Sequence, residues 1–198
     1  MDEFLFHMES YIRSGGVVMF PILVVSFIMW MLIINRVYVM RKLFIKNIPR
    51  IEAGELVKEN RMPHKKYQGA NSLLVREFLS GRTGDRELDG YILDETVLRL
   101  IMEMDRYLAF IAVLSGVAPL LGLLGTVVGM MATFDVITVF GTGNAKAMAG
   151  GISVALITTQ TGLLVSIPGL YMSGFLNRRA DNLKHRISAT GMYLRRFL

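Results

Sequence analysis

Three long stretches of the chain carry no charged side chain, and each is long enough to cross a lipid bilayer. They cover residues 14–35, 107–134 and 147–177, and each is bounded by charged residues on both sides. About 20 apolar residues suffice for a membrane-spanning helix, because an α-helix rises about 1.5 Å per residue across a hydrocarbon core of about 30 Å. The pattern predicts transmembrane helices over 15–35, 107–134 and 147–177 of an all-α integral membrane protein.

The connection over 36–106 lacks the alternation of a β-strand and is typical of helices. Pro49 and Pro63 divide its first half, because proline interrupts a helix interior. The apolar spacing around them favours short helices over 51–60 and 72–79. We therefore expect this region to be built from helices.

A longer helical pattern leads into the second span. From about Leu88 onward, apolar residues recur on one helical face: Leu93, Val97, Leu100, Ile101, Met104 and Leu108. No helix-breaking residue separates this face from the span, so we expect one continuous helix from about Leu88 into the membrane. The tail over 178–198 is expected to continue the third span in the same way, giving two long helical extensions.

Basic residues are concentrated in two of the connecting regions, and this predicts the orientation. Region 36–106 holds fourteen Lys and Arg residues and the tail 178–198 holds six, whereas the segment 1–14 and the turn 135–146 hold one each. Short cytoplasmic loops of membrane proteins carry the excess of Lys and Arg. We therefore expect 36–106 and 178–198 to be cytoplasmic, and the N-terminus and the turn to face outward.

The overall charge follows from the same asymmetry. A net charge of +6 and a pI of about 9.7 would suggest a nucleic-acid partner for a soluble protein. Here 53% of the residues are hydrophobic and the mean hydropathy is +0.45, which favours a membrane protein instead. We expect no nucleic-acid partner, and contacts with anionic membrane lipids as a secondary consequence.

The N-terminal segment does not match a cleaved signal peptide. Asp2, Glu3 and Glu9 outnumber Arg13 where a signal peptide carries basic residues, and no small-residue cleavage site follows the first span. We interpret this span as an uncleaved anchor. Segment 1–14 is expected to be a periplasmic amphipathic segment, because its apolar residues recur at helical spacing: Phe4, Leu5, Met8, Tyr11 and Ile12.

The second and third spans carry seams of small and hydroxylated residues, at alternating steps of four and three. The seams are Ser115, Pro119, Gly122, Thr126, Gly129 and Thr133 in the second span, and Ala155, Thr159, Gly162, Ser166, Gly169 and Ser173 in the third. Small residues permit close approach of membrane helices, and hydroxyls hydrogen-bond across them. The seams therefore indicate either helix packing alone, or packing combined with lining of a central space that holds another component.

The spans offer no catalytic or metal-binding chemistry. None contains Asp, Glu, Lys, Arg or His, the chain has no cysteine, and its three histidines are far apart. We therefore expect no metal, no cofactor and no enzymatic activity. Proton pathways in membranes normally depend on titratable groups, so any proton-carrying acid must come from a partner. Thr126 and Thr159, both near the middle of their spans, are the candidates to form a polar site with it.

Two segments resemble a known family. They are APLLGLLGTVVGMMATF at 118–134 and GISVALITTQTGLLVSIPG at 151–169, and they resemble the MotA/TolQ/ExbB proton-channel family, closest to ExbB. The resemblance implies an inner-membrane homopentamer whose second and third helices line a pore. The pore would hold an ExbD-like single-span partner with an essential aspartate, and proton flow would energise a TonB-like protein. The family's pore threonines fall on Thr126 and Thr159.

One departure and several alternatives accompany this resemblance. ExbB and TolQ carry a glutamate in the third helix where this chain has Val154. A TolQ-like or other stator subunit, serving envelope maintenance or gliding, is an alternative function. A non-conducting membrane scaffold is another, because it would explain the seams and the absence of charge equally well.

Overall fold

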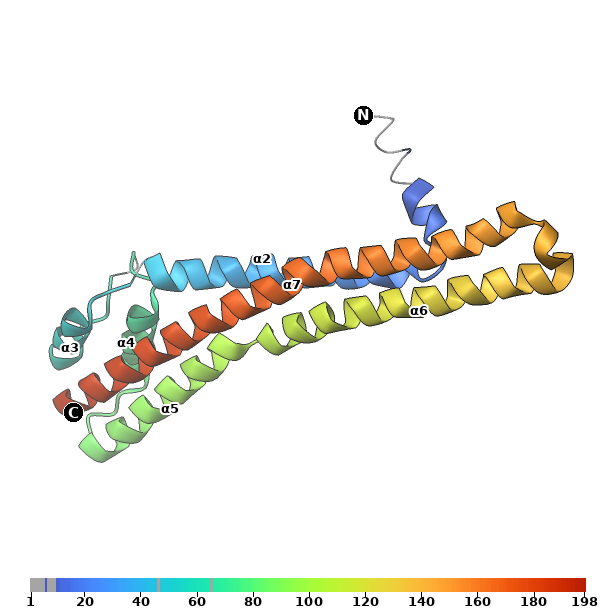
Figure 1. The fold of residues 1–198 in the computed structure, drawn as a ribbon. Helices are drawn as coiled ribbons and strands as arrows, with labels where there is room; N and C mark the ends of the chain where they lie inside the picture. The colour runs from blue at the N-terminus through green and yellow to red at the C-terminus, as the bar shows by residue number, and fades with distance from the viewer. Residues whose placement is uncertain (1–5, 7–9, 46, 65) are drawn as a thin grey trace. The chain divides into compact units, whose positions relative to one another are not determined.

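The computed structural model describes residues 6, 10–45, 47–64 and 66–198. All regular secondary structure among these residues is helical, as Figure 1 shows, and the expected all-α class is confirmed. Residues 10–14 are helical, while most of the expected amphipathic segment 1–14 lies outside the described residues. The elements that follow are α2 (Met19–Ile45), α3 (Arg50–Lys58), α4 (Ala70–Gly81), α5 (Arg86–Asp105), α6 (Leu108–Phe140), η1 (Gly141–Gly143), α7 (Ala145–Leu194) and η2 (Arg195–Phe197).

Three helical stretches are long and apolar enough to cross a membrane. They are Met19–Ile45, Arg86–Gly143 and Ala145–Phe197, with mean hydropathies of 2.1, 2.2 and 1.5 in their most apolar windows. The second and third contain the uncharged stretches 107–134 and 147–177, and the first covers residues 19–35 of the uncharged stretch 14–35, so each expected span is matched by one of these helical stretches. The helices over 51–60 and 72–79 are confirmed as α3 and α4.

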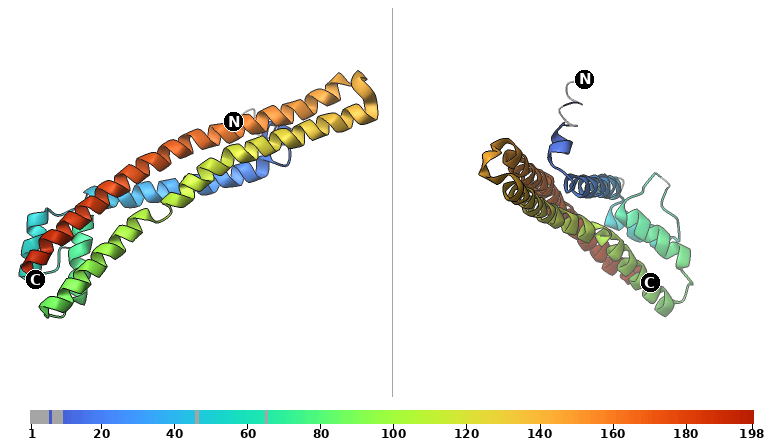
Figure 2. Two further views of the ribbon diagram at one scale, coloured as in Figure 1. Left: turned by 60° about the horizontal axis from the view of Figure 1, so that its bottom comes forward. Right: turned by 90° about the vertical axis from the view of Figure 1, so that its right-hand side faces the viewer.

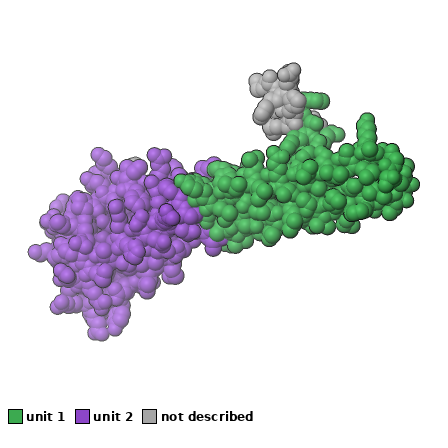
Figure 3. Space-filling view, in the orientation of Figure 1, with its two compact units in different colours: residues 1–33, 110–173 green, residues 34–109, 174–198 purple. Residues whose placement is uncertain are grey.

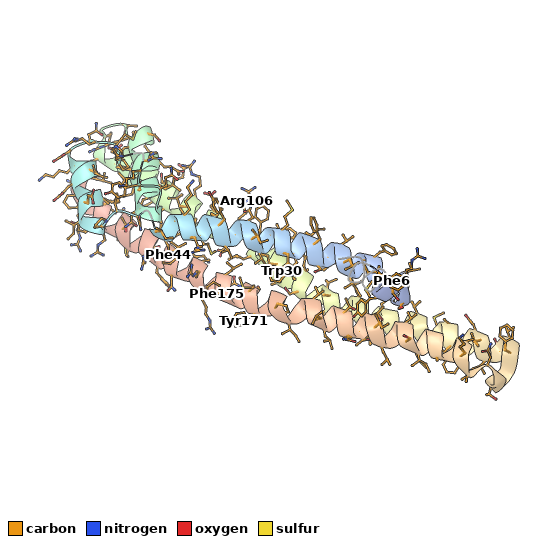
Figure 4. All side chains as sticks on the ribbon, turned by 90° about the horizontal axis from the view of Figure 1, so that it is seen from above. Phe6, Trp30, Phe44, Arg106, Tyr171 and Phe175 are labelled. Carbon is orange, nitrogen blue, oxygen red and sulfur yellow. The ribbon has the colours of Figure 1, made fainter. Side chains whose placement is uncertain are left out.

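The chain forms two compact units, which are coloured separately in Figure 3. Unit 1 comprises residues 1–33 and 110–173, and unit 2 comprises 34–109 and 174–198. In unit 1, α6 and α7 run side by side in the views of Figures 1 and 2. The first part of α2 keeps many bulky apolar side chains exposed, among them Phe27 and Trp30, which is the pattern of a lipid-facing helix. Trp30 is labelled in Figure 4.

Unit 2 is held together by an apolar core and a buried polar bridge. Phe78 and Leu93 are fully buried where α4 and α5 pack together. Asn71, at the start of α4, accepts a hydrogen bond of 3.1 Å from the Thr190 hydroxyl on α7. Its amide nitrogen donates to the Ile48 carbonyl at 2.9 Å. A buried amide is costly unless it is paired, so this bridge fixes the position of α4 against α7.

Two arginines of α7 stack on aromatic rings of α2 and α7 within unit 2. The Arg179 guanidinium lies 5.6 Å from the ring centroid of Phe44 and 4.9 Å from that of Phe175. Arg186 lies 4.9 Å from the same Phe44 ring. Figure 4 shows Phe44 and Phe175 on α2 and α7. These cation–π contacts tie the last part of α2 to α7.

A buried carboxylate organises the turn before α5. Asp89 accepts hydrogen bonds from the Thr83 backbone N–H at 2.7 Å, the Thr83 hydroxyl at 3.0 Å and Arg82 Nε at 3.2 Å. Burial raises the pKa of Asp89, but the hydrogen bonds from Thr83, Arg82 and Gly84 outweigh burial and hold the pKa below its ordinary value. Asp85 caps the helix by accepting the Glu87 N–H at 2.9 Å.

The expected continuous helix from Leu88 into the second span is wrong. α5 ends at Asp105, Tyr107 has a φ of +65°, and α6 begins at Leu108. Arg36 on α2 donates to the Glu103 carbonyl at 2.8 Å and also to the Met104 carbonyl. The last carbonyls of a helix have no partner within that helix and need one from elsewhere. The Arg36 side chain, 67 residues before Glu103 in the sequence, is that partner and stabilises the break between α5 and α6.

The turn between α6 and α7 is shorter than the expected 135–146. α6 continues through Asp135 to Phe140, and α7 begins at Ala145, where the Asn144 side chain accepts the Ala147 N–H at 3.1 Å. α7 then runs without a break to Leu194, so the expected helical extension of the third span is confirmed. Lys184 within it forms an ion pair with Asp105 at 2.5 Å, which raises the Lys184 pKa against the opposing effect of burial.

Candidate functional site

α6 and α7 contact each other through the small residues of the two seams. A Cβ atom on Gly122 would lie 3.0 Å from the Thr158 carbonyl oxygen and 3.1 Å from the Thr159 Cα. A Cβ on Gly129 would lie 2.6 Å from the Gly151 carbonyl oxygen. Larger residues would push these backbones apart, so the glycines permit the close approach that membrane helices use for packing.

Hydroxyl groups complete this contact. The Ser166 hydroxyl on α7 donates to the Ser115 carbonyl on α6 at 2.8 Å, and both residues are buried. The Ser115 hydroxyl donates to the Ile111 carbonyl of its own helix at 2.7 Å. Thr133 likewise donates to the Gly129 carbonyl at 3.0 Å. In lipid each polar group needs a partner, and these hydroxyls find theirs within the chain.

Most of the residues predicted to line a pore are covered by the chain's own helices. The buried ones are Ser115, Gly122, Gly129, Thr133, Ala155, Gly162, Ser166 and Gly169. Pro119, Thr126 and Thr159 are half-buried and keep an exposed edge. The seams therefore serve to pack α6 against α7 within the chain. Among these residues, Pro119, Thr126 and Thr159 are the ones with surface left that a partner protein could contact.

Thr159 on α7 contacts α6 about one helical turn before Thr126. The Thr159 hydroxyl is 3.0 Å from the Ala155 carbonyl of its own helix and 3.3 Å from the Gly122 carbonyl on α6. Thr126 follows Gly122 by four residues, about one turn or roughly 5 Å along the axis. The Thr126 hydroxyl donates to the Leu123 carbonyl at 2.6 Å. The structure thus places Thr159 against the helical turn that precedes Thr126, although the two threonines are 33 positions apart in the sequence.

The bonding of these hydroxyls defines what they offer to a ligand. A hydroxyl has one proton to donate and two lone pairs that accept. The hydroxyls of Thr126 and Thr159 each donate their proton to a backbone carbonyl. Toward a ligand, both hydroxyls can therefore accept a hydrogen bond through their free lone pairs. Rotation about the C–O bond would turn each into a donor, so both can serve a group that alternates between a protonated and an ionised form.

Two further threonines in this part of α7 were not among the predicted site residues. Thr158 is fully buried and packs so closely on α6 that a Cβ on Gly125 would overlap its side chain. The Thr161 hydroxyl lies 2.9 Å from the Tyr11 hydroxyl in the N-terminal segment. The polar run at 158–161 was the signal in the sequence, since such groups must face protein or water inside a span. The partner Tyr11 has no sequence signal of its own.

Val154, the position at which the resemblance led us to expect a glutamate, lies beside Gly16. It is half-buried, and its Cγ1 would be 3.4 Å from a Cβ placed on Gly16, where the chain has a φ of +65°. Its carbonyl accepts the Thr158 hydroxyl at 2.9 Å. The side chain therefore faces the start of the first span.

The site is polar but has no carboxylate, imidazole or basic side chain within the uncharged stretches. No Asp, Glu, Lys, Arg or His occurs in 14–35, 107–134 or 147–177. Within the part of the chain that the structure describes, no group of three or more His, Cys, Asp or Glu side chains is arranged to hold a metal ion. The arrangement can solvate a proton-carrying group, and it holds no acid or base of its own.

Comparison with known proteins identifies the family to which these helices belong. The model of the MotA/TolQ/ExbB proton channel family matches residues 66–189, from just before α4 to near the end of α7. The chain belongs to the MotA/TolQ/ExbB proton channel family. The match includes both seams and both candidate threonines of this MotA/TolQ/ExbB member, while α2 and α3 lie outside it.

Individual relatives carry the ExbB name, which confirms the expected similarity to ExbB within the MotA/TolQ/ExbB family. A putative biopolymer transport protein ExbB homolog of Methanothermobacter thermautotrophicus is 29% identical over 178 residues, covering 86% of this chain and 63% of the relative. A putative ExbB-like protein of Synechocystis is 31% identical over 176 residues, covering 84% and 66%. The biopolymer transport protein ExbB of Helicobacter pylori is 40% identical over 93 residues, covering 46% and 64%. This chain spans just under two thirds of their length.

Proposed function

We propose that this chain is the ExbB-like ring subunit of a motor driven by the proton-motive force. It works in the bacterial inner membrane with an ExbD-like single-span partner that carries the proton-binding aspartate. The motor energises a TonB-like protein for import across the outer membrane. The observation that carries the proposal is the pair Thr126 and Thr159, two half-buried hydroxyls in spans that contain no Asp, Glu, Lys, Arg or His.

The ring is a homo-oligomer, and we expect a pentamer. Its subunits place α6 and α7 toward the axis and α2 toward lipid. Support comes from the composition of the helices: α2 exposes bulky residues such as Phe27, whereas α6 and α7 carry the glycine and hydroxyl seams. Thr126, Thr159 and Pro119 then form the edge that faces the partner helix.

The threonines act by solvating the partner's carboxyl group in both protonation states. When the carboxyl is protonated it donates, and the lone pairs of Thr126 and Thr159 accept. When it is ionised it accepts, and the hydroxyl protons rotate from the Leu123 and Gly122 or Ala155 carbonyls toward it. Hydrogen bonds to the charged form favour ionisation, so the ring sets how readily the proton is released.

A proton-flux measurement tests this role. The chain and its single-span partner are purified together, reconstituted into liposomes, and given a pH gradient. Thr126→Val/Thr159→Val keeps the side-chain shape and removes both hydroxyls. A hydrogen bond to a charged group contributes roughly 1.5–3 kcal/mol, so we expect the partner-dependent flux to fall by about tenfold or more. Native mass spectrometry must show the same assembly as in the unaltered protein.

Thr138→Val provides the matched control. Thr138 also lies on α6 and donates to a carbonyl three residues earlier, that of Asp135 at 2.8 Å, but it is exposed and outside the seam. Its replacement should leave the flux unchanged. Full flux in a correctly assembled double variant would reject the proton-path role and leave helix packing as the explanation of both threonines.

A second candidate function is a membrane scaffold that conducts no ions. Ser115, Ser166 and Thr133 find their hydrogen-bond partners within the chain, which is what a purely structural seam requires. A flux that is the same with and without the single-span partner would favour the scaffold. A TolQ-like role in envelope maintenance, or a role in gliding, uses the same proton chemistry and differs in the protein that is energised.

A further inference from the structure

Unit 2 contains a cavity lined by basic and apolar side chains at the end of α2. Its volume is about 370 Å³, and a second hollow of about 380 Å³ shares Tyr38, Lys42 and Gln68 with it. Arg76 from α4 lines the first and Arg41 from α2 lines the second. We propose that this double cavity binds the headgroup of an anionic phospholipid from the cytoplasmic leaflet.

The charge of the lining favours an anion. Arg41, Lys42 and Arg76 contribute three cations, against one carboxylate from Glu103. Among the ion pairs of the described residues, none involves these three cations. Within the described part of the chain, the hydrogen bond from Arg76 goes to the Tyr67 carbonyl and is long, at 3.4 Å. A phosphate group would therefore find cationic donors that no carboxylate already occupies.

The depth of the cavity corresponds to the headgroup layer. Asn35 is the last residue of the first uncharged stretch, and Tyr38, Arg41 and Lys42 follow it on the same helix. At about 1.5 Å per residue they lie roughly 4–10 Å beyond the end of that stretch. The polar layer on each side of a bilayer is about 5–8 Å thick. Arg41 and Lys42 thus lie at the depth of the lipid phosphates, and Arg76 lines the same cavity as Lys42.

The apolar part of the lining identifies the occupant as a lipid. Val39, Leu43, Leu73 and Met104 form the remainder of the first cavity. Ile34, Tyr38 and Ile45 recur on one face of α2 and are each 65% exposed or more. A free phosphate ion would leave this apolar surface exposed to water, whereas the acyl chains and glycerol backbone of a lipid would bury it. Basic pockets beside transmembrane helices on the cytoplasmic side are typical sites for anionic lipids.

Native mass spectrometry of the purified chain tests the site. The assembly in detergent is titrated with dioleoyl phosphatidylglycerol, with dioleoyl phosphatidylcholine, and with inorganic phosphate. We expect phosphatidylglycerol to bind at least tenfold more tightly than phosphatidylcholine, and millimolar phosphate to leave it bound. Each cation near an anionic headgroup contributes roughly fivefold in affinity, so Lys42→Gln/Arg76→Gln should weaken phosphatidylglycerol binding about twentyfold.

Two further variants separate the site from general attraction to basic protein. Lys58→Gln/Arg61→Gln removes the same charge from exposed positions of unit 2 and should leave binding unchanged. Lys42→Arg/Arg76→Lys keeps both charges and should retain the preference. Equal weakening by the two Gln pairs, equal binding of the two lipids, or displacement by phosphate would each overturn the proposal. The last result would identify a site for free phosphate instead.

Discussion

Gly162 on α7 lies directly against Gly122 on α6. A Cβ atom on Gly162 would be 3.1 Å from the Gly122 Cα and 2.7 Å from the Ala118 carbonyl oxygen. Two glycines from different helices therefore meet at a close backbone contact, with Gly122 one helical turn before Thr126 on α6. The spacing of the backbones here determines whether the Thr159 hydroxyl can reach the Gly122 carbonyl.

Gly162→Ala should therefore destabilise unit 1. The added methyl group meets backbone atoms that cannot rotate away, and overpacking of this kind costs roughly 1–3 kcal/mol. Gly116 is the matched control, because it lies on the same pair of helices with nothing within 4 Å of its Cβ position. Gly116→Ala should be neutral or slightly stabilising, since alanine favours a helix more than glycine does. Thermal unfolding in detergent measures both; equal midpoints would contradict the close contact.

Asp89→Asn should destabilise unit 2 and reduce its sensitivity to acid. The folded-state pKa of Asp89 lies below its ordinary value of 3.8, which is that of the unfolded chain. The ionised Asp89 side chain therefore stabilises the folded protein fully at any pH above the pKa that Asp89 has in the unfolded chain. This stabilisation is lost as the pH falls through the lower pKa that Asp89 has in the folded protein. Breaking the buried pair with Arg82 should cost roughly 3 kcal/mol near neutral pH.

Unfolding followed from pH 7 to pH 3 tests the Asp89 prediction, with Asp94→Asn as the control. Asp94 is half exposed and pairs with Arg195 at 3.3 Å on the surface, so its loss should cost about 0–1 kcal/mol. If Asp89→Asn retained the acid dependence of the unaltered chain, the carboxylate would not be the group that stabilises the turn.

The three spans and the two short helices could be predicted because each depends on a local pattern. An uncharged run of more than twenty residues has few stable alternatives to a spanning helix, and the proline positions separated α3 and α4 from their neighbours. The seams were visible for the same reason, since steps of four and three place Gly122 and Gly129 on one face of a helix. What these patterns could not tell was which residues face another helix of the same chain.

The missed features depend on contacts between distant residues. The break at Tyr107 has no breaker in its own sequence, and it is stabilised by Arg36 from another helix. The hydrogen bond between Tyr11 and Thr161 joins residues 150 positions apart, so neither residue identifies the other. The turn after α6 was overestimated because Asp135 was expected to mark the end of the helix, although a charged residue is tolerated inside a helix that extends beyond the uncharged stretch.

Arg36→Met should loosen the junction between α5 and α6. Arg36 is only 4% exposed, and its loss leaves the Glu103 and Met104 carbonyls without their side-chain partner. Unsatisfied buried groups of this kind cost roughly 1–3 kcal/mol. Hydrogen exchange of the amides around Arg106 should become faster. Arg178→Met, at an exposed position of α7, serves as the control for loss of one positive charge, and equal exchange in the two variants would contradict the capping role.

Val154→Glu introduces the carboxyl group that the resemblance to ExbB and TolQ predicts at this position, and the result depends on what surrounds the side chain. Val154 is half-buried beside Gly16, whose Cβ position lies 3.4 Å from it, which is ordinary contact distance and not a tight fit. A longer side chain can therefore turn toward the exposed edge without displacing the first span. An unpaired carboxyl inside a membrane is costly unless it reaches water or a partner.

We expect Val154→Glu to assemble to the same size as the unaltered protein in detergent and to lose no more than about 1–3 kcal/mol of stability. Val154→Gln is the matched control, because it has the same shape and carries no charge. If both variants assemble, the position reaches a polar space; if Glu fails and Gln assembles, the edge is closed by lipid or by a neighbouring subunit. Failure of both would show that the contact with Gly16 leaves no room for a longer side chain, against the distance observed.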